Sequence, residues 1–435
     1  ILGLESCKRF NLIQRIDEVS TTEKTEPNVV SVEKQEFIKS NIDVFEGIGK
    51  FKDKFHFDVD PNCKVTIKPP RRIPLSLQPK VKDALIELEN QGIICKVDNP
   101  SSFVSNLVVV EKPNGKVRLC IDPTDLNKAT KRMPHLIPSM QDISHKLSNK
   151  SVFSLLDLRD GFYNIVLDEE SSEHCAFSTP FGTFKFLRLP FGLNISPEIF
   201  QKFTEKIFGD IEGLLIYFDD ILVSGANEEE HDLILKQVIE KARGCNVKFN
   251  PAKFQYKVKS VKYFGEVFSQ EGHTPDPDRI RAITALESPK SKKELQRLLG
   301  LFNFLRNYIP NMAEVTAPLR ELLRKDVAFL WMPKHEQALA KLKDLVSKPP
   351  VLVHFDENKP IIIQCDSSKN GMGFSLFQNG RPIMYGSKSL TDTQIGYSQT
   401  EKEMLAICES VKKYHHFVYG RSNVVVQTDH KPLVS

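Results

Sequence analysis

Leu214-Leu-Ile-Tyr-Phe-Asp-Asp-Ile-Leu-Val223 is the stretch of sequence that constrains this protein most. Two adjacent carboxylates, Asp219 and Asp220, interrupt a run of apolar residues that is typical of a buried strand. Neighbouring carboxylates in an apolar setting repel each other and lose hydration, so their burial is costly unless a cation compensates them. Since hard oxygen ligands suit Mg²⁺, the stretch predicts a divalent-metal site. The alternative is a surface turn that happens to hold two acids, and the apolar flanks on both sides argue against it.

A second apolar run, Val152-Phe-Ser-Leu-Leu-Asp157, also ends on a carboxylate. Three carboxylates from two adjacent strands would form the paired-metal clamp of phosphoryl transfer, in which one ion activates the attacking oxygen and the other stabilises the leaving pyrophosphate. The residues therefore predict a two-metal phosphoryl transferase. A polymerase and a nuclease acting alone are both open at this point.

Composition narrows the class of protein. The chain has 435 residues, which corresponds to about three domains. With 40% hydrophobic and 27% charged residues, collagen-like, fully disordered and coiled-coil proteins are excluded. The longest apolar runs are too short for a membrane span, and the eight cysteines are too far apart for a Cys-x-x-Cys knuckle. The net charge is only +4, but Lys and Arg are in local excess between Pro61 and Lys150. The excess fits either a solvated basic face or a nucleic-acid contact.

The pattern of apolar residues predicts a mixed α+β protein. Asn114-Gly115, between two β-rich runs, is a strong hairpin signal. Helices are expected at 77–90, 197–208 and 228–243, and throughout 290–346. Strands are expected at 103–110, 116–121, 153–158, 162–167 and 214–218, and again from 361 onward.

Several of these motifs, taken in order, resemble one enzyme family. Tyr217-Phe218-Asp219-Asp220 after Asp157 resembles the active-site signature of reverse transcriptases. The loop from Leu189 to Pro197 is similar to the one that lies under the templating base pair in that family. From about residue 51 to 435, the chain resembles the reverse transcriptase and RNase H region of a gypsy-type LTR retrotransposon Pol polyprotein. One departure is Pro123-Thr124, where the family often has an aromatic-Arg pair that contacts the template.

The resemblance implies roles for individual residues around the polymerase site. Phe162 would be the bulky gate against the sugar 2′ position, although core packing is the commoner role of a lone Phe. Lys112 and Arg118 would grip the dNTP triphosphate, although the hairpin alone would make them ordinary solvated charges. The implied metal ligands are Asp157, Asp219 and Asp220, and the implied template and primer contacts are Phe191, Gly192, Tyr263, Phe264 and Gly265.

A second set of acids follows near the C-terminal end. Strand-like runs end on Asp366 and Asp429, and the helix between them is expected to have Met404, Ile407 and Cys408 on its apolar face and Glu403 at the start of a turn toward the sheet. Each acid alone fits a solvated strand end or helix surface. Together they resemble an RNase H domain, whose carboxylates hold two metals that cut the RNA strand of an RNA–DNA hybrid. Glu401 is the rival for the helix position, but Glu403 fits the family register better.

The prediction is therefore a multidomain α+β protein with a fingers–palm–thumb polymerase and a truncated RNase H-like α/β domain. Its expected function is RNA-directed DNA synthesis with two Mg²⁺ ions per active site and Mn²⁺ as an alternative. Expected partners are RNA and DNA template–primer, dNTPs and the remainder of the polyprotein, with no membrane, in cytoplasmic virus-like particles. A catalytically silent nucleic-acid-binding remnant is the alternative. The expected domains are a protease tail at 1–20, a linker at 21–60, fingers and palm at 61–260, thumb and connection at 261–350, and a C-terminally incomplete RNase H-like domain at 351–435.

Overall fold

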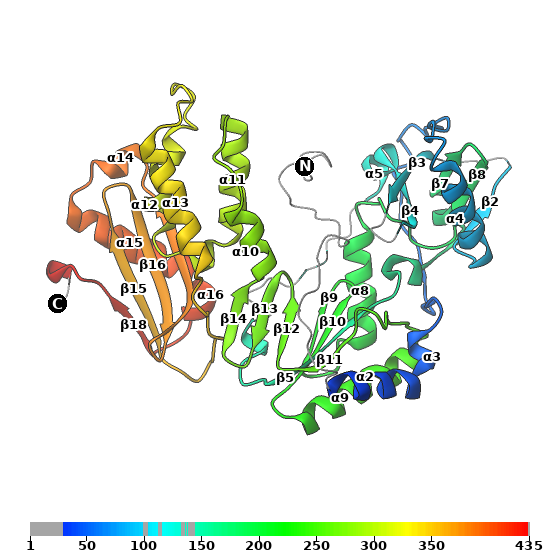
Figure 1. Cartoon of the computed structure of the whole chain (residues 1–435), viewed down its shortest axis with the longest axis horizontal. Helices are drawn as coiled ribbons and strands as arrows, with labels where there is room; N and C mark the ends of the chain where they lie inside the picture. Colours follow the sequence, from blue (N-terminus) through cyan, green and yellow to red (C-terminus); the bar gives the residue numbers. More distant parts are fainter. Residues whose placement is uncertain are drawn as a thin grey trace. The chain divides into compact units, whose positions relative to one another are not determined.

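The computed structural model describes residues 29–98, 103–111, 115–131, 135, 137 and 144–433 (Figure 1). The chain divides into two compact units. Of the described residues, the first unit holds those up to 137 and 150–261, and the second holds 144–149 and 262–433. No helix in the described part of the chain is both long enough and apolar enough to cross a membrane.

The first unit is built on an antiparallel sheet with the strand order β11-β5-β10-β9. Its two central strands are the apolar runs that end or begin on an acid, and their side chains are almost all buried. Helices α8 and α9 contact this sheet. The elements are β5 (Val152–Asp157), α8 (Ser196–Phe208), β9 (Leu214–Tyr217), β10 (Asp220–Gly225), α9 (Glu228–Gly244) and β11 (Gln255–Val258).

A second sheet of the first unit has the order β2-β8-β7-β3-β4. The predicted hairpin is its β3–β4 pair, in which Glu111 is opposite Val117. Helix α4 contacts β2 and β4. The elements are α4 (Gln78–Asn90), β2 (Ile94–Lys96), β3 (Val104–Glu111), β4 (Val117–Asp122), β7 (Ala176–Thr179) and β8 (Gly182–Phe186).

Two segments of the first unit differ from the sequence prediction. Residues 162–167 are not a strand: a 3-10 helix, η2 (Gly161–Asn164), precedes the short β6 (Val166–Leu167), because the Phe162 and Tyr163 rings pack against neighbouring aromatic rings. The described part of 21–60 is structured and contributes buried phenylalanines to the core instead of forming a linker. The remaining elements are α2 (Val29–Ser40), α3 (Ile42–Phe45), β1 (Lys54–Phe55), α5 (Thr124–Ala129) and α7 (Glu169–His174).

The second unit begins with the antiparallel sheet β12-β13-β14, followed by helices that share one apolar core. Helices α12 and α13 pack against each other, and α10 packs against α13. The elements are β12 (Ser260–Tyr263), β13 (Glu266–Ser269), β14 (Gly272–Pro275), α10 (Pro277–Thr284), α11 (Lys292–Phe304), η3 (Arg306–Tyr308), α12 (Met312–Glu321) and α13 (Pro333–Ser347).

The C-terminal part of the second unit is a sheet with the order β17-β16-β15-β18, in which only the β15–β18 pair is parallel. Helix α15 contacts β15 and β16. The elements are β15 (Ile361–Ser367), β16 (Gly371–Gln378), β17 (Arg381–Ser389), α14 (Asp392–Ile395), α15 (Gln399–Lys413), α16 (His415–Val418), β18 (Val424–Gln427) and η4 (Lys431–Leu433).

The buried face of α15 agrees with the prediction only in part. Ile407 packs partly buried against the core and Glu403 is buried, as expected. Met404, however, is 54% exposed and Cys408 is also exposed, whereas Ala406 is buried. On this buried face Glu403 reaches the sheet.

Candidate active sites

The three predicted polymerase carboxylates come together at one end of the first unit's central sheet. Asp157 ends β5 and Asp220 begins β10, and the two residues are directly opposite each other in the antiparallel register. Asp219 lies in the turn between β9 and β10, where its carbonyl oxygen accepts a hydrogen bond of 2.7 Å from the Leu158 amide. Strand pairing therefore sets the position of all three backbones.

A buried glutamine supports the turn that carries Asp219. Phe218 has a left-handed backbone with φ of 51°, which is unusual for a bulky residue. The Gln201 side chain, fully buried on α8, accepts a hydrogen bond from the Phe218 amide (2.7 Å) and donates one to the Ile216 carbonyl (3.0 Å). Sequence reasoning missed Gln201, although an amide on the apolar face of the predicted 197–208 helix is a usable signal.

The surroundings of Asp157 and Asp220 disfavour the ionised form of both carboxyl groups. Burial raises the pKa of Asp157, which is only 6% exposed, although the Lys253 ammonium donates a 2.6 Å hydrogen bond to its Oδ2 atom. Burial and the neighbouring Asp219 and Asp157 raise the pKa of Asp220 to about 6. A divalent cation would relieve this cost, so the donor set fits one. Nothing in the sequence singled out Lys253, which reaches the site only through the fold.

Three of the predicted polymerase residues form one stack beside these acids. The Phe162 ring lies 4.9 Å from that of Phe191, and the Arg118 guanidinium lies 4.8 Å over the Phe191 ring. A Cβ atom on Gly161 would be 3.7 Å from that of Asp219, so Phe162 directly follows a residue that contacts the acids. Lys112 falls outside the described residues, and its contact with a dNTP stays a prediction.

The predicted template loop is fixed against β4. Gly192 has φ of 118°, and a Cβ there would overlap the carbonyl oxygen of Ile121, so glycine is required on both counts. The Phe191 carbonyl accepts a hydrogen bond from the Ile121 amide (3.1 Å), and the Gly192 carbonyl accepts one from the Asn127 side chain (3.1 Å). The template contact itself stays a prediction.

The predicted primer hairpin is the β12–β13 turn of the second unit. Phe264 and Gly265 both have positive φ, as a tight two-residue hairpin turn requires. Tyr263 is 1% exposed and its ring packs against Phe268. Because Tyr263 is buried, the turn residues Phe264 and Gly265 are the part of the motif that can contact a primer.

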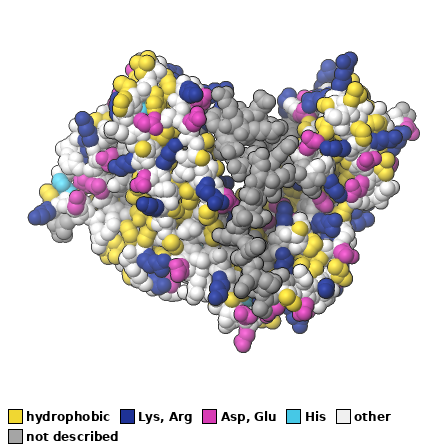
Figure 2. Space-filling view, in the orientation of Figure 1, with side chains coloured by type: hydrophobic (Ala, Val, Ile, Leu, Met, Phe, Trp, Pro, Cys, Tyr) yellow, Lys and Arg dark blue, Asp and Glu magenta, His cyan; other side chains and the backbone are white. Residues whose placement is uncertain are grey.

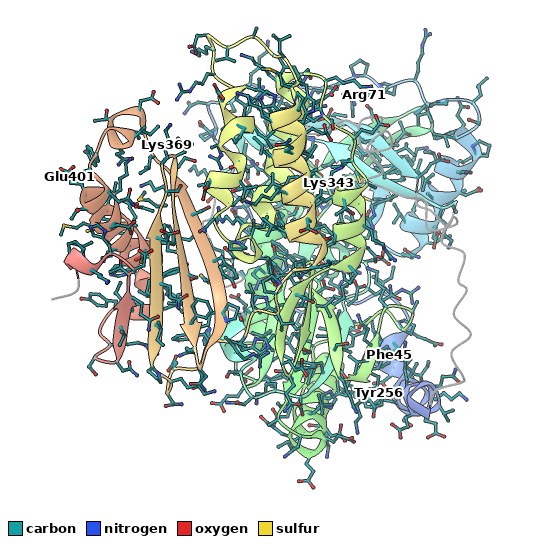
Figure 3. All side chains as sticks on the ribbon, turned by 60° about the vertical axis from the view of Figure 1, so that its left-hand side comes forward. Phe45, Arg71, Tyr256, Lys343, Lys369 and Glu401 are labelled. Carbon is teal, nitrogen blue, oxygen red and sulfur yellow. The ribbon has the colours of Figure 1, made fainter. Side chains whose placement is uncertain are left out.

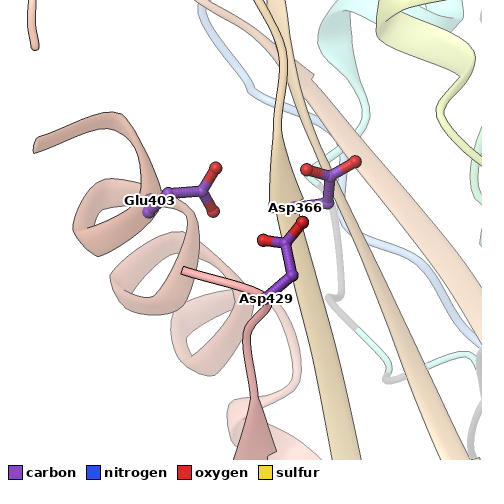
Figure 4. A group of neighbouring side chains, drawn as sticks. All are labelled: Asp366, Glu403 and Asp429. Atoms are coloured by element: carbon purple, nitrogen blue, oxygen red, sulfur yellow. The ribbon is translucent and has the colours of Figure 1, made fainter. Parts of the chain in front are cut away.

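The second set of predicted acids converges in the second unit (Figure 4). Asp366 lies on β15, Glu403 on α15, and Asp429 just after β18. One ligand oxygen from each lies within 4.8 Å of the others, and no other trio of acids, His or Cys in the described ranges meets this distance. The polymerase acids therefore do not converge as closely in this structure.

Glu403 shows that this cluster fits a cation. Its Oε1 atom accepts hydrogen bonds from the Ser367 hydroxyl (2.7 Å) and the Gln399 side chain (2.7 Å). Its Oε2 atom is buried and has no hydrogen-bond partner among the residues that the structure describes. Burial, Glu403 and Asp429 raise the pKa of Asp366. A buried carboxylate oxygen that accepts no hydrogen bond from the described residues, beside two further acids, favours binding of a positive charge.

The rival acid on α15 has a structural role. Glu401 and Ser398 form a capping box at the N-terminus of α15, in which the Ser398 amide donates a 2.8 Å hydrogen bond to the Glu401 carboxylate. Glu401 is labelled on this helix in Figure 3. Glu401 is exposed and does not belong to the acid cluster.

Two family models match the chain. Residues 110–268 match the reverse transcriptase (RNA-dependent DNA polymerase), and residues 331–426 match the RNase H-like domain found in reverse transcriptase. Both matches agree with the predicted domain pair and with the predicted enzyme class, an RNA-directed DNA polymerase.

Relatives and solved structures agree with this domain pair. Over 368 residues the chain is 32% identical to the transposon Tf2-7 polyprotein, and equally to the Tf2-3 polyprotein, of Schizosaccharomyces pombe. The match covers 82% of this chain but only 28% of the length of these curated relatives. A foamy viral protease-reverse transcriptase in complex with dsDNA has a TM-score of 0.84 at 23% identity, covering 100% of this chain and 90% of that one.

A second foamy viral structure, in complex with an RNA/DNA hybrid, has a TM-score of 0.79 at 22% identity and covers 97% of this chain and 57% of that chain. At this identity the likeness establishes the fold, and the predicted multidomain α+β polymerase fold is confirmed. In the reverse transcriptase domain, Asp157, Asp219 and Asp220 all lie inside the matched range. In the RNase H-like domain, Asp366 and Glu403 lie inside it and Asp429 lies just beyond.

Proposed function

We propose that this chain is the polymerase and RNase H part of a gypsy-type LTR retrotransposon polyprotein, and that it extends a primer with dNTPs on an RNA or DNA template. The observation that supports this most is the opposed pair Asp157 and Asp220, with Asp219 in the turn between the strands, inside a reverse transcriptase domain. These three residues would hold two Mg²⁺ ions, with Mn²⁺ as an alternative.

Each residue of the polymerase site then has a physical task. When bound, the metal ions activate the primer 3′-hydroxyl and stabilise the charge that develops on the pyrophosphate. The Lys253 ammonium neutralises part of the charge of Asp157 at the Oδ2 atom, which a bound cation would share. The Arg118 guanidinium, oriented by the Phe191 ring, binds the triphosphate as a fork. Phe162 excludes the 2′-hydroxyl of a ribonucleotide by its volume.

The RNase H-like cluster would cut the RNA strand of an RNA–DNA hybrid. Asp366, Asp429 and the free Oε2 atom of Glu403 would hold its divalent ions, and Ser367 and Gln399 orient Glu403. The nucleic acids bound in the foamy viral structures support template–primer partners. On the face shown in Figure 2, Lys and Arg side chains are scattered among acidic and apolar ones and form no single large basic patch. Such scattered Lys and Arg side chains can contact phosphates without reading the base sequence. We also propose that the remainder of the polyprotein is a partner of this chain and that the chain is located in cytoplasmic virus-like particles.

A primer-extension assay separates this enzyme from a silent nucleic-acid-binding remnant. The chain is incubated with oligo(dT) on poly(rA), with dTTP, and with Mg²⁺, Mn²⁺ or a chelator. The proposal expects extension with either ion and none with the chelator. Binding of the primer–template without extension under any ion condition would favour the remnant.

A further inference from the structure

The first turn of α12 is docked on the RNase H-like sheet. The Ala313 amide donates a 3.1 Å hydrogen bond to the Ser387 hydroxyl on β17. A Cβ atom on Gly371 would lie 3.0 Å from that of Ala313, and a Cβ on Gly373 would overlap the side-chain oxygen of Asn311. Two glycines of β16 thus let the start of this helix approach the sheet more closely than larger residues would allow.

This approach brings a further acid to the predicted metal cluster. Gly373 is directly opposite Asp366 in the β15–β16 register. A small pocket at this point contains Asp366 from the sheet together with Asn311 and Glu314 from the helix turn. The other lining residues are Ser368, Gly371, Met372 and Gly373. None of them carries a positive charge.

The Glu314 carboxylate is available to bind a cation or its waters. It is exposed, and it makes no hydrogen bond or ion pair with the part of the chain that the structure describes. It lines the same small pocket as Asp366. Asp366, which shares this pocket with Glu314, also belongs to the cluster with Glu403 and Asp429.

We propose that Glu314 is a fourth carboxylate of the RNase H-like divalent-cation centre, supplied by α12, outside the matched RNase H-like range. Because a bound Mg²⁺ or Mn²⁺ ion would keep several waters, Asp366, Glu403 and Asp429 would hold the ion, and Glu314 would accept hydrogen bonds from its waters. The proposal rests on the proposed RNase H function. It makes the cation affinity of this domain depend on a helix that precedes it.

Mn²⁺ binding measured by electron paramagnetic resonance tests this proposal. The background is the full chain with Asp157→Asn and Asp219→Asn, so that the polymerase site contributes little. Glu314→Gln is expected to weaken Mn²⁺ binding about tenfold, as one unit charge near a divalent ion should across a partly hydrated gap. The matched control is Glu321→Gln, which removes the same charge at the other end of α12 and is expected to change the affinity less than about twofold.

Two further variants distinguish a loss of charge from a loss of packing, and a failure of the Glu314 role from a failure of the whole centre. Glu314→Asp keeps the charge and should retain most of the affinity, so equal weakening by Asp and Gln would show that packing, not charge, is responsible and would overturn the proposal. Asp366→Asn should abolish binding in the same background. If it does not, the proposed RNase H centre itself fails. If Asp366→Asn abolishes binding but Glu314→Gln behaves like Glu321→Gln, only the role of Glu314 is refuted.

Discussion

Neutralising Asp220 should stabilise the metal-free first unit at neutral pH. Burial and the nearby Asp219 and Asp157 raise the pKa of Asp220 from an ordinary value of 3.8 to about 6. The unfolded chain loses this proton near pH 4 and the folded chain near pH 6, so stability falls as pH rises between these values and the full cost remains above pH 6. Asp220→Asn keeps the shape and removes this cost.

The size of the effect follows from the shift. About two pKa units correspond to about 3 kcal/mol at 1.36 kcal/mol per unit. Because Asp220 is partly open to solvent, we expect a gain of about 1–2 kcal/mol in the free energy of unfolding at pH 7.5. The gain should shrink toward zero near pH 4, where the carboxyl group is protonated in both states.

Hydrogen exchange of the β5 and β10 amides in EDTA is the appropriate assay, because the single tryptophan, Trp331, lies in the other unit. Asp210→Asn, an exposed acid paired with Lys241, is the control and should leave the exchange rates nearly unchanged. Faster exchange in Asp220→Asn at pH 7.5 would show that the fold stabilises this carboxylate without a cation, which would refute the reasoning.

Three further variants test the neighbouring residues. Phe162→Val should leave dNTP incorporation largely intact and reduce discrimination against ribonucleotides at least about tenfold, measured as the ratio of kcat/KM values; an unchanged ratio would remove Phe162 as the gate. Replacing Lys112 and Arg118 together should raise the KM for dNTP more than it weakens primer–template binding, and equal losses would make them nucleic-acid contacts. Gly192→Ala should lower stability by about 2 kcal/mol or more, because it combines a disallowed backbone with a steric overlap; an unchanged melting temperature would contradict this.

The sequence was sufficient to place both acid sets because each acid stands next to an apolar strand or on a helix that follows one. Strand pairing then brings Asp157 opposite Asp220, and the parallel β15–β18 pair brings Asp366 near Asp429. Both pairings follow from the strand register, which the alternation of buried and exposed residues along each strand specifies. That alternation can be read from the local sequence.

Other features depend on contacts between distant residues. Lys253 reaches Asp157 across 96 positions, so no local pattern could reveal it. The segment 162–167 is rich in aromatic and β-branched residues, as strands are, but the packing of Phe162 against Phe191 and Phe200 favours a 3-10 turn. On α15, burial of Glu403 serves the acid cluster, so the apolar residues alone identify the buried face only in part.

Single-turnover primer extension by Asp220→Asn tests the central claim most directly. The wild-type chain, this variant and the Asp210→Asn control are compared at saturating dNTP and Mg²⁺, with binding of the primer–template measured in parallel. We predict that Asp220→Asn binds the primer–template but extends it about a thousandfold more slowly, corresponding to about 4 kcal/mol of lost transition-state stabilisation. The control should extend at the wild-type rate. Extension by Asp220→Asn at the wild-type rate would contradict the assignment of this carboxylate, and with it the account of the polymerase site.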